Sequence, residues 1–335
     1  MKLKSYLYSS TLLLLLSLAG CSTQEKNKEF VDPETIEKDA EFRSTISSGN
    51  FIKLSAGNMY YEIVNQSADT VLVLVHGFSV PSYIWDSTYY AAQKRGYGVL
   101  RYDVYGRGYS DNPDVVYDGA LFSEQLHELL EALKITKKIN LVGLSYGGRI
   151  ISAYAAQYPD RIQNLIYVDP AGFETINAAE YPAMVTDEEI QAFKQSESYK
   201  TMASGQLGDF YDATPFTGWD KKYETMMKYK GFVRALLSTR KNSPSMENEQ
   251  IRITNAGLPV YCIWGEHDKV VELNSVEANI FKQIPTTQLY VISKAGHLPN
   301  MEQTRTFNAI VFDKIIRNKN LEASAAYTFK KNSVN

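Results

Sequence analysis

The 335-residue sequence predicts an α/β protein with a mostly parallel sheet that is covered by helices on both faces. Short, nearly continuous apolar runs such as Val71–Val75 recur along the chain, and strands that are buried on both faces have this composition. Segments with helical spacing of apolar residues separate these runs, as in successive strand–helix units. The composition, 44% hydrophobic and 22% charged, is that of an ordinary globular protein.

Eight strands are expected from the apolar runs and their turn residues. Phe51–Leu54 and Met59–Val64 predict an opening hairpin, because Ala56-Gly57-Asn58 between them is suited to a turn. The predicted central strands are Val71–Val75, Gly98–Tyr102, Ile139–Leu144, Asn164–Val168, Val260–Trp264 and Gln288–Ile292. The predicted helices between and after them are Ile84–Lys94, Leu121–Leu133, Tyr146–Tyr158, Leu273–Gln283 and Thr304–Arg317.

One long interval, residues 172–258, interrupts this alternation. It is too long for a loop in a compact domain, and helical patterns recur in it around Asp187–Ser196 and Tyr223–Leu237. The sequence therefore predicts a helical insertion here. The core is then made of residues 51–171 and 259–317.

The motif Gly143-Leu144-Ser145-Tyr146-Gly147 stands between a predicted strand and a predicted helix. In that context a Gly-x-Ser-x-Gly motif is typical of a sharp turn that carries a nucleophilic serine. We expect a side chain at either glycine to clash with the neighbouring strand or helix. Ser145 would then be exposed at the carboxyl end of its strand.

A serine nucleophile requires a base and a group that orients the base. The four histidines are His76, His127, His267 and His297. His297 is the one that lies in a loop after the last predicted strand, so we predict it as the base. Asp268 follows the preceding strand and is the predicted acid, which gives the order Ser145, Asp268, His297. Glu266 is the nearest competitor for the acid, and Asp169 is a more distant one.

A tetrahedral intermediate also requires donors for its oxyanion. The residue after the nucleophile commonly supplies one, so the N–H of Tyr146 is a candidate. The second candidate is the N–H of Phe78, in the turn His76-Gly77-Phe78-Ser79 after an early central strand.

Taken together, these motifs resemble the α/β-hydrolase family. The resemblance rests on His76-Gly77-Phe78, Asp103–Ser110, Gly143–Gly148, Trp264–Asp268 and Gly296-His297. It implies the α/β-hydrolase fold, with a mostly parallel eight-stranded sheet, a helical cap at residues 172–258 and no cofactor. The loop Asp103–Ser110 resembles a structural loop of that family. Haloalkane dehalogenases and epoxide hydrolases resemble the chain too, but they carry an Asp nucleophile, which Ser145 argues against.

The expected function is hydrolysis of carboxylic esters, a class of small-molecule substrate, with apolar acyl groups favoured by the aromatic and Met content of residues 172–258. Amidase or peptidase, thioesterase, perhydrolase and carbon–carbon hydrolase activities remain alternatives, because one triad serves all of them. A non-catalytic, lipid-anchored binding protein is a further alternative. A net charge of −3 does not suggest nucleic acid as a partner, and histidines and cysteines are too scattered for a structural metal site.

The amino terminus is expected to be a targeting segment. Lys2 and Lys4 precede an apolar stretch that ends in Leu18-Ala19-Gly20-Cys21, which resembles a bacterial lipobox. Residues 1–20 would be the signal peptide, and a lipid on Cys21 would anchor the chain to a membrane of the bacterial cell envelope, outside the cytoplasm. Residues 21–50 are expected to be a tether and residues 318–335 a polar tail. Cys262, in an apolar strand, is expected to be buried and reduced.

Overall fold

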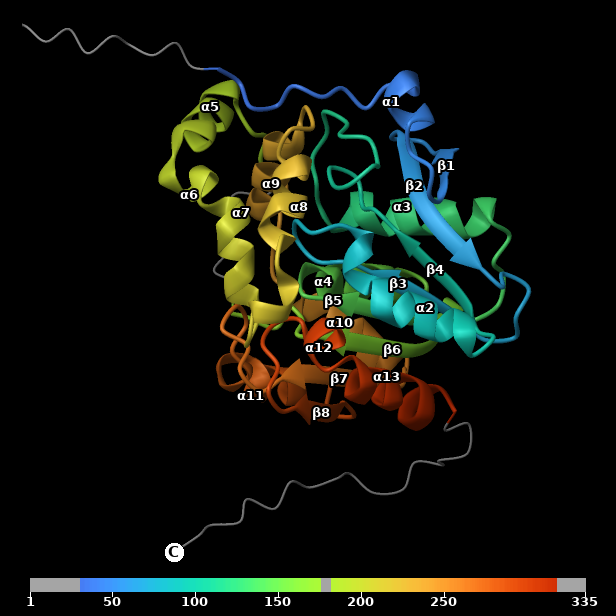
Figure 1. Cartoon of the computed structure of the whole chain (residues 1–335). Helices are drawn as coiled ribbons and strands as arrows, with labels where there is room; N and C mark the ends of the chain where they lie inside the picture. Colours follow the sequence, from blue (N-terminus) through green and yellow to red (C-terminus); the bar gives the residue numbers. More distant parts are fainter. Residues whose placement is uncertain (1–30, 176–181, 318–335) are drawn as a thin grey trace, which may run out of the picture. The chain divides into compact units, whose positions relative to one another are not determined.

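The computed structural model describes residues 31–175 and 182–317, and the described residues from Pro33 onward belong to one compact unit. An eight-stranded sheet crosses this unit in the order β1-β2-β4-β3-β5-β6-β7-β8 (Figure 1). The strands are β1 (Asn50–Lys53), β2 (Asn58–Val64), β3 (Val71–Val75), β4 (Gly98–Tyr102), β5 (Ile139–Leu144), β6 (Ile162–Val168), β7 (Val260–Gly265) and β8 (Gln288–Ile292). Only the pairs β1–β2 and β2–β4 are antiparallel, so the predicted fold class is confirmed.

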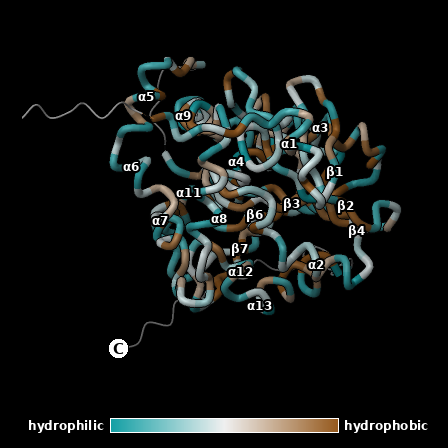
Figure 2. The backbone as a smooth tube through the Cα atoms, turned by 45° about the horizontal axis from the view of Figure 1, so that its top comes forward, coloured by the Kyte–Doolittle hydropathy of each residue, from teal (hydrophilic) through white to brown (hydrophobic). Residues whose placement is uncertain are grey.

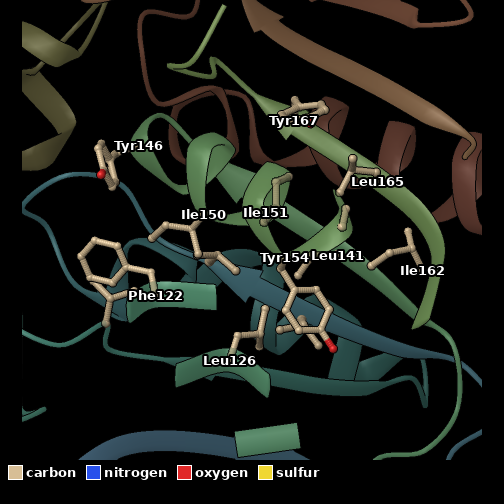
Figure 3. Packing of buried hydrophobic residues seen from close by; sticks show 14 of the residues in the cluster. Phe122, Leu126, Leu141, Tyr146, Ile150, Ile151, Tyr154, Ile162, Leu165 and Tyr167 are labelled. Atoms are coloured by element: carbon tan, nitrogen blue, oxygen red, sulfur yellow. The ribbon is translucent and has the colours of Figure 1, made fainter. Parts of the chain in front are cut away.

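Helices cover both faces of the sheet. Alternate residues of each strand point to opposite sides, and in the central strands both sets are mostly apolar and are buried. Val71, Val73 and Val75 of β3 belong to one hydrophobic cluster that also contains residues of α3 (Gly119–Ala132), α4 (Tyr146–Gln157) and α11 (Leu273–Gln283). Leu72 and Leu74 pack instead with α2 (Asp86–Lys94), α13 (Thr304–Ala309) and the π-helical segment Ile310–Ile316. Figure 3 shows side chains of α3, α4, β5 and β6 meeting in the first cluster. Figure 2 shows hydrophobic colour along the central strands.

The interval between β6 and β7 forms a helical cap. Its helices are α5 (Asp187–Gln195), α6 (Glu197–Lys200), α7 (Met202–Gly205), α8 (Trp219–Met226) and α9 (Phe232–Lys241). They lie beyond the end of the sheet to which the arrows of β6 and β7 point (Figure 1). The next helix, α10 (Glu247–Asn255), packs against α4 and α11 of the core although the sequence placed it in the cap range.

The helix expected around Tyr223–Leu237 is two helices, α8 and α9. The break falls at Gly231, whose φ of 82° lies in the left-handed region that glycine adopts without strain. Glu34 then accepts hydrogen bonds from the N–H groups of Gly231 (3.0 Å) and Val233 (2.7 Å) and so satisfies the first turn of α9. A residue almost two hundred positions away therefore fixes where this helix begins.

Glu34 belongs to a segment, Pro33–Ser44, that packs against both the cap and the core; we call it the strap. The sequence predicts a tether here, because these residues show little apolar periodicity. Polar contacts hold them instead: Glu34 pairs with buried Lys194 of α5 at 2.9 Å, and the N–H of Ile36 donates to Lys228 at 2.9 Å. The strap ends in the short helix α1 (Ala40–Ser44).

Lys38 connects the strap to the core. Its buried ammonium donates to the carbonyl groups of Gly108 and Ser110 and to Asn112 Oδ1 at 2.6 Å. Burial lowers the pKa of this amine to about 7, although the charges of Asp111 and Asp103 act in the opposite direction.

Three of the sequence predictions lie outside the described residues. They are the signal peptide 1–20, the lipidation site Cys21 and the polar tail 318–335. In the part of the chain that is described, no helix is both long and apolar enough to cross a membrane. Cys262 lies buried in β7 as a free thiol, as predicted.

The pKa of Lys38 predicts a specific pH dependence of stability. Because its pKa falls from about 10.5 in the unfolded chain to about 7 in the fold, the native state binds fewer protons between these values and stability rises with pH there. We expect the free energy of unfolding of wild type, relative to Lys38→Met, to increase from pH 7 to pH 10 in urea titrations. The exposed Lys230, in Lys230→Met, is the matched control and should show no such trend. Parallel pH curves for wild type and Lys38→Met would contradict the assignment.

Candidate active site

Ser145 sits in a sharp turn between β5 and α4. Its φ of 53° is unusual for a residue other than glycine, and its side chain is partly exposed. The expected crowding at the flanking glycines is present: a Cβ on Gly143 would lie 2.5 Å from the Gly147 carbonyl oxygen, and one on Gly147 would lie 2.6 Å from the Val75 carbonyl oxygen. Only glycine therefore fits at these two positions.

Asp268 and His297 form a buried pair. His297 Nδ1 lies 2.8 Å from Asp268 Oδ2, and the two residues are 4% and 6% exposed. The other oxygen, Oδ1, accepts hydrogen bonds from the N–H groups of Val270 (2.7 Å) and Val271 (3.1 Å). These donors hold the carboxylate group against Nδ1 of the ring. With the proton on Nδ1, His297 Nε2 is the ring atom that can accept a proton.

The sheet brings Ser145 to the same edge as this pair. Beyond the ends of the parallel strands, Ser145 N–H donates to Val168 at 2.9 Å and Asp169 N–H donates to Ile263 at 3.0 Å. The ends of β5, β6 and β7 are thus held side by side. Within the described residues Ser145 Oγ and His297 make no hydrogen bond with each other. Such bonds are often long before a substrate binds.

The two predicted oxyanion donors flank Ser145. Tyr146 opens α4, where the first N–H groups have no partner in the helix. Within the described part of the chain neither the N–H of Tyr146 nor that of Phe78 donates to a protein acceptor. The turn that carries Phe78 lies close to the serine, since a Cβ on Gly77 would be 3.2 Å from Ser145 Cβ.

Two buried residues hold this turn in place. The His76 ring accepts the N–H of Val104 at Nε2 (2.9 Å) and, with its proton on Nδ1, donates to the Gly77 carbonyl (2.9 Å). Burial lowers the pKa of His76 to about 3, so the ring stays neutral. Arg107 Nε donates to the Phe78 carbonyl (2.7 Å), and its Nη2 donates to Thr239 of the cap (2.9 Å). The family resemblance implies a structural role for the loop of Arg107. The bond from Arg107 to the Phe78 carbonyl shows such a role, because it holds the turn next to Ser145.

In the described part of the chain, the His297 ring is hydrogen-bonded to Asp268 and to neither of the competing acids. Glu266 is exposed and lies 3.6 Å from His267, whose ring stacks on Tyr211. Asp169 accepts the N–H of Gly265 at 2.8 Å. Among the described residues, Asp169, Asp268 and His297 are the group whose oxygen and nitrogen atoms gather within 4.8 Å of one another. The bonds within Asp268–His297 occupy atoms that a metal ion would need.

The cap closes over His297. The His297 N–H donates to the Asp209 carbonyl at 2.7 Å, and burial raises the pKa of the Asp209 carboxyl to about 6, while the nearby His297 lowers it. Phe210 follows, stacked on Phe216 with ring centroids 4.1 Å apart and edge-on to Trp219. Of the apolar cap residues, Met184 and Tyr211 are instead largely exposed.

A separate cavity of about 250 Å³ is bordered by α3, α4 and α10. Its lining includes Arg149, Glu249 and Arg252 but neither Ser145 nor His297. This cavity is therefore distinct from the site at the end of the sheet.

Comparisons with known proteins support the fold described above. The model of a family described as alpha/beta hydrolase fold matches residues 70–304. Lipase 1 of Psychrobacter immobilis is 27% identical over 87% of this chain and 90% of its own length. A 2-hydroxy-6-oxononadienedioate/2-hydroxy-6-oxononatrienedioate hydrolase of Burkholderia vietnamiensis is 26% identical over 75% of this chain and 88% of its own length. The solved structure of a thermophilic esterase from Thermogutta terrifontis superposes with a TM-score of 0.65 at 20% identity, over 80% of this chain and 98% of that one.

The depressed pKa of His76 gives a prediction that is independent of activity. We expect the ring resonances of His76, assigned by their loss in His76→Gln, to stay unchanged between pH 5 and 8 in an NMR titration, in the tautomer with the proton on Nδ1. Because an unfolded His titrates near 6.5, the native state binds fewer protons below that pH, and His76 lowers stability as the pH falls from 6.5 towards about 3. A titration midpoint above pH 6 would contradict this account of the turn.

Proposed function

The chain belongs to the α/β-hydrolase fold family of enzymes, and we propose that it is a serine hydrolase that cleaves carboxylic esters through an acyl-enzyme intermediate. The observation that carries the proposal is the buried 2.8 Å pair of Asp268 and His297, at the same edge of the sheet as Ser145 on its sharp turn. This is the arrangement of nucleophile, base and orienting acid that acyl transfer requires.

Each residue has one task in the proposed reaction. His297 Nε2 takes the proton from Ser145 as the hydroxyl attacks the ester carbonyl, and Asp268 stabilises the resulting imidazolium. The N–H groups of Phe78 and Tyr146 donate to the oxyanion. His297 then protonates the departing alcohol, and water releases the acid by the same steps in reverse. No step calls for a cofactor.

Esters with apolar acyl groups are the proposed substrate class. The cap residue Asp209 bonds to the backbone of His297, Phe210 follows it in the chain, and the Phe210 ring packs edge-on against Trp219. Aromatic side chains next to the site would favour apolar chains over charged ones. The similarity to a protein named Lipase 1 supports the same class.

Membrane attachment is a further part of the proposal. The lipobox-like sequence before Cys21 supports a lipid anchor in the bacterial cell envelope, facing outside the cytoplasm. A lipid there would keep the enzyme at a surface where water-insoluble esters collect. We propose the division into signal peptide 1–20, segment 21–50, core 51–171 and 259–317, cap 172–258 and tail 318–335, with α10 at the end of the cap range packed against the core.

Carbon–carbon bond hydrolysis is the second candidate. It is favoured by the 26% identity to a hydrolase of 2-hydroxy-6-oxononadienedioate, a compound whose name indicates two carboxylates. The two candidates differ in what the site would have to bind, because a dianion requires cationic partners and an apolar acyl chain does not. Turnover of that dienedioate without turnover of any ester would replace the first candidate with the second.

The direct test uses residues 22–335 and a series of p-nitrophenyl esters from acetyl to palmitoyl. We expect turnover with an optimum at one chain length, and we expect Ser145→Ala to lower kcat by about a thousandfold or more while the domain stays folded. Ser152, a buried serine later in α4 that bonds to the Gly148 carbonyl, provides the control substitution Ser152→Ala. Equal activity of Ser145→Ala and wild type would refute the mechanism.

A second prediction separates the two carboxylates that follow β7. Asp268→Asn should lower kcat by about three to four orders of magnitude, because the amide supports the wrong His297 tautomer. Glu266→Gln should keep most of the activity, since its side chain points to His267. The comparison is made on kcat with both variants shown to be folded by circular dichroism. The opposite pattern would make Glu266 the acid.

A further inference from the structure

Asp169 is a buried acid that the proposed reaction does not use. It follows β6 with a φ of 43°, a conformation in which Asp is tolerated better than most residues. Its N–H donates to Ile263 at 3.0 Å, and its Oδ1 accepts the N–H of Gly265 at 2.8 Å. Asp169 thus joins the ends of β6 and β7. Its partner Gly265 lies three residues before Asp268.

The second oxygen of Asp169 has no donor. The residue is 0% exposed, and Oδ2 is buried without a hydrogen-bond partner among the described residues. Atoms of Asp169, Asp268 and His297 nevertheless lie within 4.8 Å of one another. An ionised Asp169 would therefore place an unpaired carboxylate oxygen in the interior, next to a second carboxylate.

Two carboxylates at this separation in a buried site share a proton, because both cannot be ionised without a large cost. The hydrogen bonds decide which residue is protonated. Asp268 accepts from the N–H groups of Val270 and Val271 and from His297 Nδ1, whereas Asp169 accepts from Gly265 alone. The extra donors keep the charge on Asp268. Burial and the charge of Asp268 together raise the pKa of Asp169 well above its usual range.

We propose that Asp169 is a neutral positioning residue whose protonated Oδ2 donates a hydrogen bond to the carboxylate of Asp268 and holds that carboxylate towards His297. This proposal rests on the proposed function, in which His297 acts as the base. As a donor, the Oδ2–H group finds in the Asp268 carboxylate the hydrogen-bond partner that Oδ2 otherwise lacks. It gives Asp268 a fourth hydrogen bond beside those from Val270, Val271 and His297, and this bond restrains rotation of the carboxylate away from the ring.

The protonation state is tested without any assay of activity. At pH 7 we expect an infrared carbonyl band of a protonated carboxylic acid in wild type that is absent from Asp169→Asn, a variant that preserves size and both hydrogen-bonding positions. Asp212→Asn, which changes an exposed acid of the cap, is the matched control and should leave the band unchanged. If the spectra of wild type and Asp169→Asn show no difference in this band, the proposal is wrong, whatever the enzyme hydrolyses.

The positioning role is tested by the pH profile of kcat for ester hydrolysis. Asn at position 169 still donates to Asp268, so we expect Asp169→Asn to retain at least about a third of the wild-type kcat, and Asp169→Ala to lose up to about a hundredfold with little change in KM. If Asp169 is neutral, the fall of kcat at acidic pH should have the same midpoint in Asp169→Asn as in wild type. If Asp169 were ionised, removing its charge would move that midpoint down by about one pH unit.

The other titratable groups near Asp169, Asp268 and His297 are the same in wild type, Asp169→Asn and Asp169→Ala. They are Glu302 and the Cys262 thiol beside Asp169, and Asp209 of the cap beside His297. Equal losses in the Asn and Ala variants, or a shifted midpoint in Asp169→Asn, would overturn the positioning role. Thermal unfolding shows whether any loss reflects misfolding. Should wild type fail to cleave esters at all, the infrared difference still decides the protonation of Asp169.

Discussion

Backbone hydrogen bonds beyond the ends of β5, β6 and β7 hold the segments that carry the site residues side by side. The N–H of Ser145 bonds to the last residue of β6, and the N–H of Asp169 bonds to β7. Parallel strands end at the same edge, so side chains that are more than a hundred residues apart meet there. The bond between His297 and Asp268 depends on this register, because each residue follows a neighbouring strand.

Buried polar groups do much of the positioning around Ser145. His76 and Arg107 each bond to a carbonyl of the turn that carries Phe78, and each reaches a second segment of the chain. In a dry interior an unpaired polar group is costly, so such networks resist small displacements. The Phe78 N–H is therefore held in a fixed direction before any substrate arrives, which is what stabilisation of an oxyanion requires.

The strap gives the cap a fixed place by similar means. Glu34 pairs with Lys194 of α5 and accepts two N–H groups at the start of α9, while Lys38 bonds to the loop of Gly108 and Ser110. A buried ion pair contributes little net stability after desolvation, but separating its partners leaves an uncompensated buried charge, which is costly. The strap thus selects one position of the cap over His297, and it links that position to the segment that precedes the catalytic core.

The sequence by itself determined the succession of strands along the chain, the turn at Ser145 and the candidates for acid and base. The strands follow from local apolar patterns, and the turn follows from Gly143 and Gly147, which lie against segments that are close in the fold. The acid and base candidates follow from their positions after predicted strands. The split between α8 and α9, the strap and the pairing of Asp169 with Asp268 were decided by tertiary structure. In each case one polar side chain meets a partner that is distant in sequence, such as Glu34 and Gly231. Apolar periodicity reports which face of a segment is buried, but it does not report which distant segment buries it. That information exists only once the sheet and the cap have assembled.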